Sequence, residues 1–85
     1  MKATVLIRPK EGILDPQGEA VEGSLRKLGY GVSGARVGRL VDVELATDDR
    51  NEALAQLERM CEQLLANPLI EGYTIELHGE PGGAT

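Results

Sequence analysis

The side chains that could do chemistry near neutral pH are few in this chain. Among its 85 residues there is one cysteine, Cys61, and one histidine, His78. A cysteine nucleophile needs a base beside it, whereas Cys61 falls on the apolar stripe of a predicted helix, where a thiol behaves as a small hydrophobic side chain. His78 alternates with polar residues near the end of a predicted strand, so we expect it to be exposed and without a chemical role. The sequence therefore predicts no catalytic residue and no zinc site built from Cys and His.

Carboxylates and glycines could also build a site. Asp15 and Asp49 lie where helices are predicted to begin, and there a carboxylate caps exposed backbone N–H groups. The spacing Gly29-x-Gly31-x-x-Gly34 formally matches a dinucleotide-binding fingerprint. That fingerprint must follow a strand and open a helix, whereas here it ends a helix and precedes a strand. We therefore expect no cofactor to bind to this chain.

Four basic residues stand out because the chain is acidic, with nine basic against 14 acidic residues and a net charge of −5. Arg8, Lys10, Arg36 and Arg39 lie in predicted strands and loops, and arginine is the usual partner of carboxylates at interfaces. We interpret them either as solvated surface charges or as contacts to another subunit, with a pocket for a phosphorylated ligand as a third alternative. The acidic charge and the scarcity of aromatic residues argue against nucleic-acid binding.

The core that this chain can build is small. It has no Trp or Phe and only two Tyr, so the core must be made of aliphatic residues, and a single cysteine excludes a disulfide within the chain. Oligomerisation is the remaining way to bury enough surface. No stretch approaches the ~20 apolar residues of a membrane span, and the apolar N-terminal run is too short for a signal peptide. We expect no membrane contact and a cytoplasmic location.

The spacing of apolar residues predicts five elements. Alternation marks strands, and apolar residues three and four apart mark helices. Proline at the first helical position and glycine after the last one mark the ends of the first helix, and Asn67-Pro68 ends the second. The predicted elements are a strand over 2–8, a helix from Pro16 to a stop at Gly29, a strand region over 32–45, a helix from Asp49 to the stop at Asn67-Pro68, and a strand over 70–78.

This order predicts an α+β fold, a two-layer sandwich with both helices on one face of a mainly antiparallel sheet, ferredoxin-like in outline. The domain covers residues 1–78, and residues 79–85 are expected to form a loose tail. The region 32–45 is long for one strand. It could be one long bent strand or a hairpin around Gly38-Arg39, and the sequence does not decide between them.

Several segments resemble a known family when they are taken in order and at their spacing. They are Val5-Leu6-Ile7-Arg8-Pro9-Lys10, Ile13-Leu14-Asp15-Pro16-Gln17-Gly18, Leu28-Gly29-Tyr30, Val37-Gly38-Arg39, and Met60-Cys61 through Asn67-Pro68-Leu69-Ile70-Glu71. Together they resemble the PurS family, the small subunit of phosphoribosylformylglycinamidine (FGAM) synthase in purine biosynthesis. No single motif among them is catalytic.

The resemblance implies a subunit that performs no chemistry alone. It implies a homodimer or homotetramer that bridges a glutaminase subunit and a large synthetase subunit, with ATP and Mg²⁺ on the large subunit and none in this chain. Ammonia released from glutamine would pass between the two enzymes. On this basis we assign Arg8, Lys10, Arg36, Arg39, Asn67 and Pro68 to subunit contacts.

Two other functions suit the same order of elements. One is an ACT-like domain that senses a small molecule and gains stability when it binds. The other is an acylphosphatase-like enzyme, in which Arg8 or Arg36 would act with Asn51 or Asn67, although nothing in the sequence places these residues together.

Overall fold

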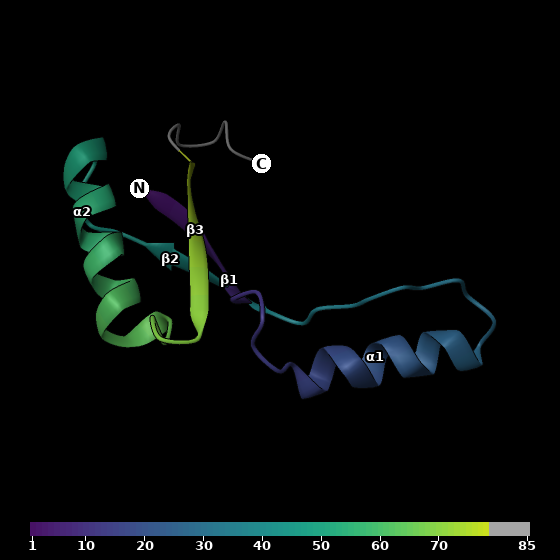
Figure 1. Ribbon diagram of the computed structural model, residues 1–85. Helices are drawn as coiled ribbons and strands as arrows, with labels where there is room; N and C mark the ends of the chain where they lie inside the picture. The colour runs from purple at the N-terminus through teal and green to yellow at the C-terminus, as the bar shows by residue number, and fades with distance from the viewer. Residues whose placement is uncertain (79–85) are drawn as a thin grey trace.

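The computed structural model describes residues 1–78, and its centre is a three-stranded antiparallel sheet (Figure 1). Strand β1 (Lys2–Pro9) lies in the middle, between β2 (Arg39–Glu44) and β3 (Glu71–His78). Both neighbours run antiparallel to β1. The predicted first and last strands are therefore present, and they lie side by side although they are far apart in the sequence.

Alternation along β1 gives the sheet two different faces. Ala3, Val5 and Ile7 point to one face and are almost completely buried. Helix α2 (Arg50–Met60) lies on this face, and its fully buried Leu57 belongs to the same apolar cluster. The apolar residues at every second position of β1 thus form the face of the sheet that packs against α2.

The opposite face of the sheet is not covered by a helix within residues 1–78, since Leu40 remains 59% exposed there. A polar cluster crosses all three strands on this face. Thr4 Oγ1 donates a hydrogen bond to Asp42 Oδ1 at 2.7 Å and lies 2.7 Å from His78 Nε2. His78 is half-buried and hydrogen-bonded, so our expectation of an exposed histidine was wrong. Nothing in the sequence indicated that Thr4 would lie within hydrogen-bonding distance of His78.

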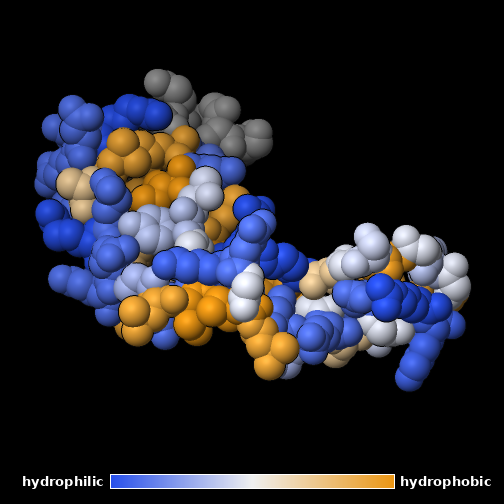
Figure 2. All heavy atoms as spheres, viewed as in Figure 1, coloured by the Kyte–Doolittle hydropathy of each residue, from blue (hydrophilic) through white to orange (hydrophobic). Residues whose placement is uncertain are grey.

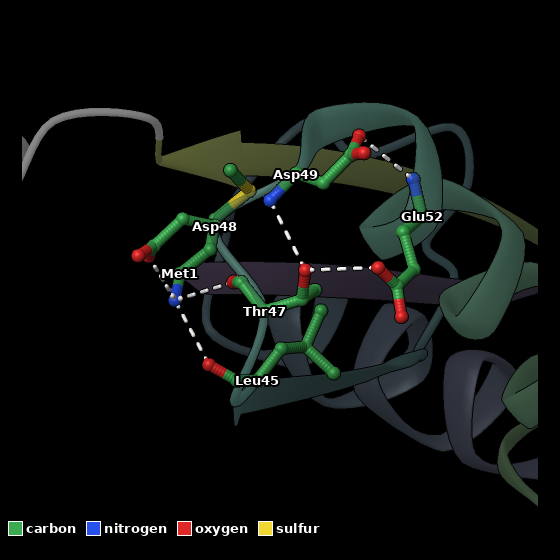
Figure 3. A network of polar contacts seen from close by, with 6 residues as sticks. All are labelled: Met1, Leu45, Thr47, Asp48, Asp49 and Glu52. Carbon is green, nitrogen blue, oxygen red and sulfur yellow. Dashed lines mark hydrogen bonds and ion pairs between the residues drawn. The ribbon is translucent and has the colours of Figure 1, made fainter.

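Helix α2 begins with the predicted cap. The Asp49 carboxylate accepts a hydrogen bond from Glu52 N at 3.3 Å, while the Thr47 hydroxyl donates one to Glu52 Oε2 at 3.2 Å (Figure 3). Thr47 also accepts from Asp49 N at 3.1 Å, which closes a small network. The ammonium group of Met1 donates to Leu45 O at 2.9 Å and to Thr47 O at 3.2 Å. The start of β1 is thereby joined to the connection between β2 and α2.

Helix α2 continues into a π-helical turn, η1 (Cys61–Leu65), in which Ala66 N donates to Cys61 O at 3.0 Å. The helical spacing of the sequence puts Leu64 on the same apolar stripe as Cys61, but Leu64 is 83% exposed. The wider π turn changes the helical phase and rotates this side chain outward, while Cys61 and Ala66 stay buried. The helical backbone ends before Asn67, as predicted.

Helix α1 (Pro16–Lys27) extends away from the sheet as an arm, and residues 31–38 run back beside it (Figure 1). Asp15 caps the helix and Gly29 follows it with φ +99°, both as predicted. Gly18 is the only buried residue of α1. The arm explains a Cα radius of gyration of 16.2 Å, against about 12 Å for a compact domain of this length.

The predicted α+β fold class is confirmed, with two helices and a mainly antiparallel sheet. The position of α1 differs from our expectation, because α2 lies on the sheet whereas α1 lies beyond its end (Figure 1). The region 32–45 is neither a long bent strand nor a hairpin at Gly38-Arg39. It is an irregular segment followed by β2, whose pairing with β1 begins only at Arg39, opposite Ile7. The predicted loose tail, 79–85, lies outside the described residues.

Candidate functional site

The predicted contact residues gather at one end of the sheet. Three segments meet there, residues 8–15, 36–39 and 67–71, which we call the three-segment end. Lys10 holds two of them together, because its Nζ donates a hydrogen bond to Pro68 O at 2.7 Å. Its backbone N–H also donates to the carbonyl of residue 70 at 2.9 Å. The loop after β1 and the turn before β3 therefore form one surface.

Asp15 joins α1 to the segment before β2. Its Oδ1 accepts a hydrogen bond from Gly18 N at 3.0 Å, and its Oδ2 accepts one from Val37 N at 2.9 Å. The bond from Val37 and then that from Gly18 hold the pKa of the Asp15 carboxyl below its ordinary value. Gly18 is required here because a Cβ would lie 2.4 Å from Ala35 O. We predicted the cap, but the contact to Val37, 22 residues away, had no signal in the sequence.

Glu71 joins the turn before β3 to the start of β2, as Asp15 joins α1 to the segment before β2. Its Oε1 accepts hydrogen bonds from Asn67 N at 2.8 Å and from Arg39 Nη2 at 2.7 Å. The bond from Asn67, and after it the contact to Arg39, lower the pKa of the Glu71 carboxyl. Asn67 also accepts from Leu69 N at 3.2 Å through its side chain. These contacts fix the conformation of the turn.

The two lowered carboxyl pKa values predict how stability depends on pH. Because the folded-state pKa of Asp15 and Glu71 lies below the unfolded value, each carboxylate stabilises the fold above the unfolded pKa, and this stability is lost as the pH falls through the folded-state pKa. We expect the urea midpoint to fall from about pH 6 to about pH 3, and to fall less in Asp15→Asn and Glu71→Gln. Urea titrations followed by circular dichroism measure this.

The control for that experiment is Glu76→Gln, which removes an exposed carboxylate from the open face of the sheet. It matches the change in net charge without touching the three-segment end. The contrary result is that the urea midpoints of the Asp15 and Glu71 variants fall as steeply between about pH 6 and about pH 3 as that of this control. In that case the hydrogen bonds to the two carboxylates do not stabilise the fold.

The remaining predicted residues also lie at this end. The Arg36 guanidinium donates to the carbonyl of Pro9, and Arg8, Arg36 and Arg39 line one open hollow of about 260 Å³. The structure therefore brings all six predicted contact residues to one end of the sheet. Five of them make contacts within the chain, so they shape this surface, and their role in binding a partner stays a prediction.

Sequence reasoning missed the apolar side chains of the same end. Leu14 is 70% exposed and Leu69 is 83% exposed, and Ile13 and Ile70 are exposed beside them. Figure 2 shows hydrophobic residues along the rim where the loop after β1 meets the turn before β3. We call these four residues the apolar edge. Their position could not be inferred from the sequence, because the loop and the turn are more than 50 residues apart.

The described part of the chain offers little for catalysis. Cys61 is buried, and burial, followed by the nearby Glu62 and Glu58 carboxylates, raises the pKa of its thiol. Within residues 1–78 no group of three His, Cys, Asp or Glu side chains is placed to hold a metal ion. No described helix is long and apolar enough to cross a membrane. What this geometry provides is a protein surface whose segments are hydrogen-bonded to one another.

Comparison with known proteins assigns the chain to a family. The family model for PurS, described as phosphoribosylformylglycinamidine (FGAM) synthase, matches residues 2–79. The chain belongs to the PurS family. Curated PurS subunits of FGAM synthase are similar to it. That of Synechocystis sp. is 44% identical over 82 residues, which cover 95% of this chain and 80% of the relative. That of Archaeoglobus fulgidus is 46% identical over 79 residues, covering 88% and 95%.

Solved PurS structures have the same fold. The crystal structure of Methanocaldococcus jannaschii PurS superposes with a TM-score of 0.78 at 34% identity, covering 88% of this chain and 92% of that one. A chain in the structure of PurLQS from Thermotoga maritima gives a TM-score of 0.81 at 29% identity, covering 88% and 93%. The resemblance stated from the sequence is confirmed, and the alternative of an ACT-like sensing domain is not supported.

Proposed function

We propose that this chain is the small, non-catalytic subunit of FGAM synthase and that it bridges the glutaminase and synthetase subunits. Membership of the PurS family over residues 2–79 carries this proposal. The similarity to a chain of PurLQS supports a place in a complex. The rigid three-segment end is the kind of surface that such a role needs, because a binding site with fixed backbone loses little entropy when it binds.

The partners and cofactors follow from this role. The partners are the large synthetase subunit, which holds ATP and Mg²⁺, and the glutaminase subunit, and this chain itself needs no cofactor. We place the complex in the cytoplasm, as a biosynthetic enzyme that touches neither membrane nor nucleic acid. The chain's net charge of −5, which would repel a phosphate backbone, supports the last point.

A second copy of the chain is part of the same proposal. Helix α1 has 12 residues, and a helix of this length is marginal in water without packing. Its apolar Val21 is exposed, and Leu28 just after it is 73% exposed. The open face of the sheet, with Leu40, is a second uncovered surface. Pairing with a second copy would cover α1, so we propose a homodimer or homotetramer.

Bridging would help catalysis by holding the two active sites in fixed positions relative to each other. Neutral ammonia is small and is lost once it reaches bulk water, so glutamine supports synthesis only if the two active sites are held in register and solvent is excluded between them. We propose that Arg8, Lys10, Arg36, Arg39 and the turn at Asn67-Pro68 belong to the contact surfaces. All of them except Arg8 also fix the loops of these surfaces through the contacts described above.

A reconstitution assay tests the proposal. The purified synthetase and glutaminase subunits are assayed for FGAM formation with and without this chain, using glutamine or ammonium as nitrogen source. We expect the chain to restore glutamine-dependent turnover and to change ammonium-dependent turnover little. The purified chain alone is expected to sediment as a homo-oligomer, with a mass above that of the 9.1 kDa monomer. Glutamine-dependent turnover that is equally fast without the chain would disprove the bridging role.

A further inference from the structure

The polar cluster on the open face of the sheet joins all three strands through one hydroxyl group. Thr4 lies on the central strand β1, Asp42 on β2 and His78 on β3. Thr4 Oγ1 donates a hydrogen bond to Asp42 Oδ1 at 2.7 Å and lies 2.7 Å from His78 Nε2. Because β1 separates the two outer strands, the Thr4 hydroxyl is the group to which both of the other side chains bond.

The register of the sheet places these three side chains within reach of one another. Thr4 is directly opposite Asp42 on β2 and directly opposite Glu76 on β3. His78 follows Glu76 by two residues, so it lies on the same face of the sheet. It reaches Thr4 diagonally, which a long or aromatic side chain can do. The hydroxyl is thus bonded to a direct partner on one side and to a diagonal partner on the other.

The directions of the two hydrogen bonds follow from proton counting. The hydroxyl has one proton, and an ionised aspartate can only accept, so this proton lies toward Asp42. The Thr4 oxygen must then accept from His78, which requires a proton on Nε2. A neutral His78 is therefore the Nε2–H tautomer. A second proton on the imidazole would enter at Nδ1 and would leave this donor in place.

The charged groups around His78 come from all three strands. Lys2 and Glu44 line a hollow of about 400 Å³ together with Asp42 and His78, and Glu76 lies on the same face. Helix α2 covers the opposite face of the sheet. The threonine at the centre is only 8% exposed, so water competes little for its hydroxyl. Hydrogen bonds in series polarise and strengthen one another in such surroundings.

We propose that Thr4 is a hydroxyl relay that couples the two outer strands of the sheet. When the bond to Asp42 is lost, the Thr4 oxygen is less polarised and becomes a weaker acceptor for His78. A change at β2 is thereby transmitted to β3, although the two strands are not neighbours. Each outer strand pairs on one side only within residues 1–78, so the relay connects the two edges of the described sheet. This property is additional to the proposed bridging function and does not depend on it.

A double-mutant cycle tests the coupling. Asp42→Ala, His78→Ala and the double variant are unfolded with urea at one protein concentration, once in the wild-type background and once with Thr4→Val, which removes only the hydroxyl function. The cycle is run at about pH 8.5, where charge on the imidazole does not contribute. In the wild-type background we expect a departure from additivity of at least about twofold in the unfolding equilibrium constant. With valine at this position the two effects should be additive.

Nitrogen NMR of the imidazole reads the proton assignment directly and requires no variant to fold. In the wild-type chain we expect a proton on His78 Nε2 that exchanges slowly with water. This signal should persist in Thr4→Ser, which keeps the hydroxyl, and should be lost in Thr4→Val. A merely structural role of Thr4 would not set the position of this proton.

Thr74→Ala is the matched control for the cycle. Thr74 lies on the same face of β3 but is exposed. Its effect on the unfolding equilibrium constant should therefore add to that of Asp42→Ala, whether or not Thr4 is present.

Three results would overturn the relay. Additive effects of Asp42→Ala and His78→Ala in the wild-type background would show that the outer strands are not coupled. Coupling that persists in Thr4→Val would show that it does not pass through the hydroxyl. A proton on Nδ1 alone, with none on Nε2, would show that Thr4 donates to His78 instead. The bridging role is tested separately by the reconstitution assay, and none of these results bears on it.

Discussion

Replacing Leu57 by alanine is expected to lower the free energy of unfolding by about 2–5 kcal/mol, the usual range for removing a buried leucine side chain. Leu57 is fully buried, and it connects α2 to the apolar face of β1 through Val5 and Ile7. The core has few other large residues, so no neighbour can fill the cavity. Because small domains are stable by only about 5–15 kcal/mol, this single change removes a large part of the stability.

Urea unfolding followed by circular dichroism measures the change. All variants must be compared at one protein concentration, because self-association adds to apparent stability. Leu64→Ala is the matched control, since Leu64 has the same side chain in the same helical region but is 83% exposed. It should stay within about 0.5 kcal/mol of the wild type. Equal losses in both variants would mean that the π turn does not turn Leu64 away from the core.

Replacing Gly38 by alanine is expected to destabilise the domain by about 1–3 kcal/mol, as overpacking does. A Cβ on Gly38 would lie 2.2 Å from Ile7 O, a backbone atom of the central strand. That carbonyl cannot move without shifting β1, so the start of β2 must move away instead. We expect a lower urea midpoint.

Gly34→Ala provides the comparison for this variant. Gly34 lies in the same segment before β2, but a Cβ there meets nothing within 4 Å. Alanine at Gly34 should be neutral or slightly stabilising, because it restricts the unfolded chain. If the two variants unfold at the same urea concentration, the close approach of Gly38 to β1 is not present in solution.

Local features of the sequence predicted much of the fold. Asp15 with Pro16, Gly29 and Asn67 with Pro68 mark helix ends through rules that involve only neighbouring residues, and all of these ends were found. The alternation of Val5 and its neighbours likewise predicted the strand β1, because the strand period acts residue by residue.

Features that depend on distant contacts could not be predicted. The hydrogen bond from Val37 to Asp15 spans 22 positions, and the approach of Gly38 to Ile7 spans 31. The π turn that exposes Leu64 depends on how the end of α2 fits the sheet. For α1, an apolar stripe predicts that one face of the helix is covered, but it does not say which chain covers it.

The apolar edge has some features that the sequence predicts and others that depend on distant contacts. Its basic neighbours Lys10 and Arg39 stood out in the sequence because they are rare charges in an acidic chain. Leu14 and Leu69 did not stand out, since a leucine next to a turn is equally compatible with a core position. Only the folded arrangement of the loop after β1 and the turn before β3 separates these cases.

The two-way contact of Asp15 has a consequence for how the complex would assemble. Its carboxylate holds the first turn of α1 and the segment before β2, and Ile13 and Leu14 immediately precede it. A second copy that binds the arm would therefore also stabilise the segment before β2. Dimer formation and the order of this segment are then thermodynamically linked, and each favours the other to the same extent.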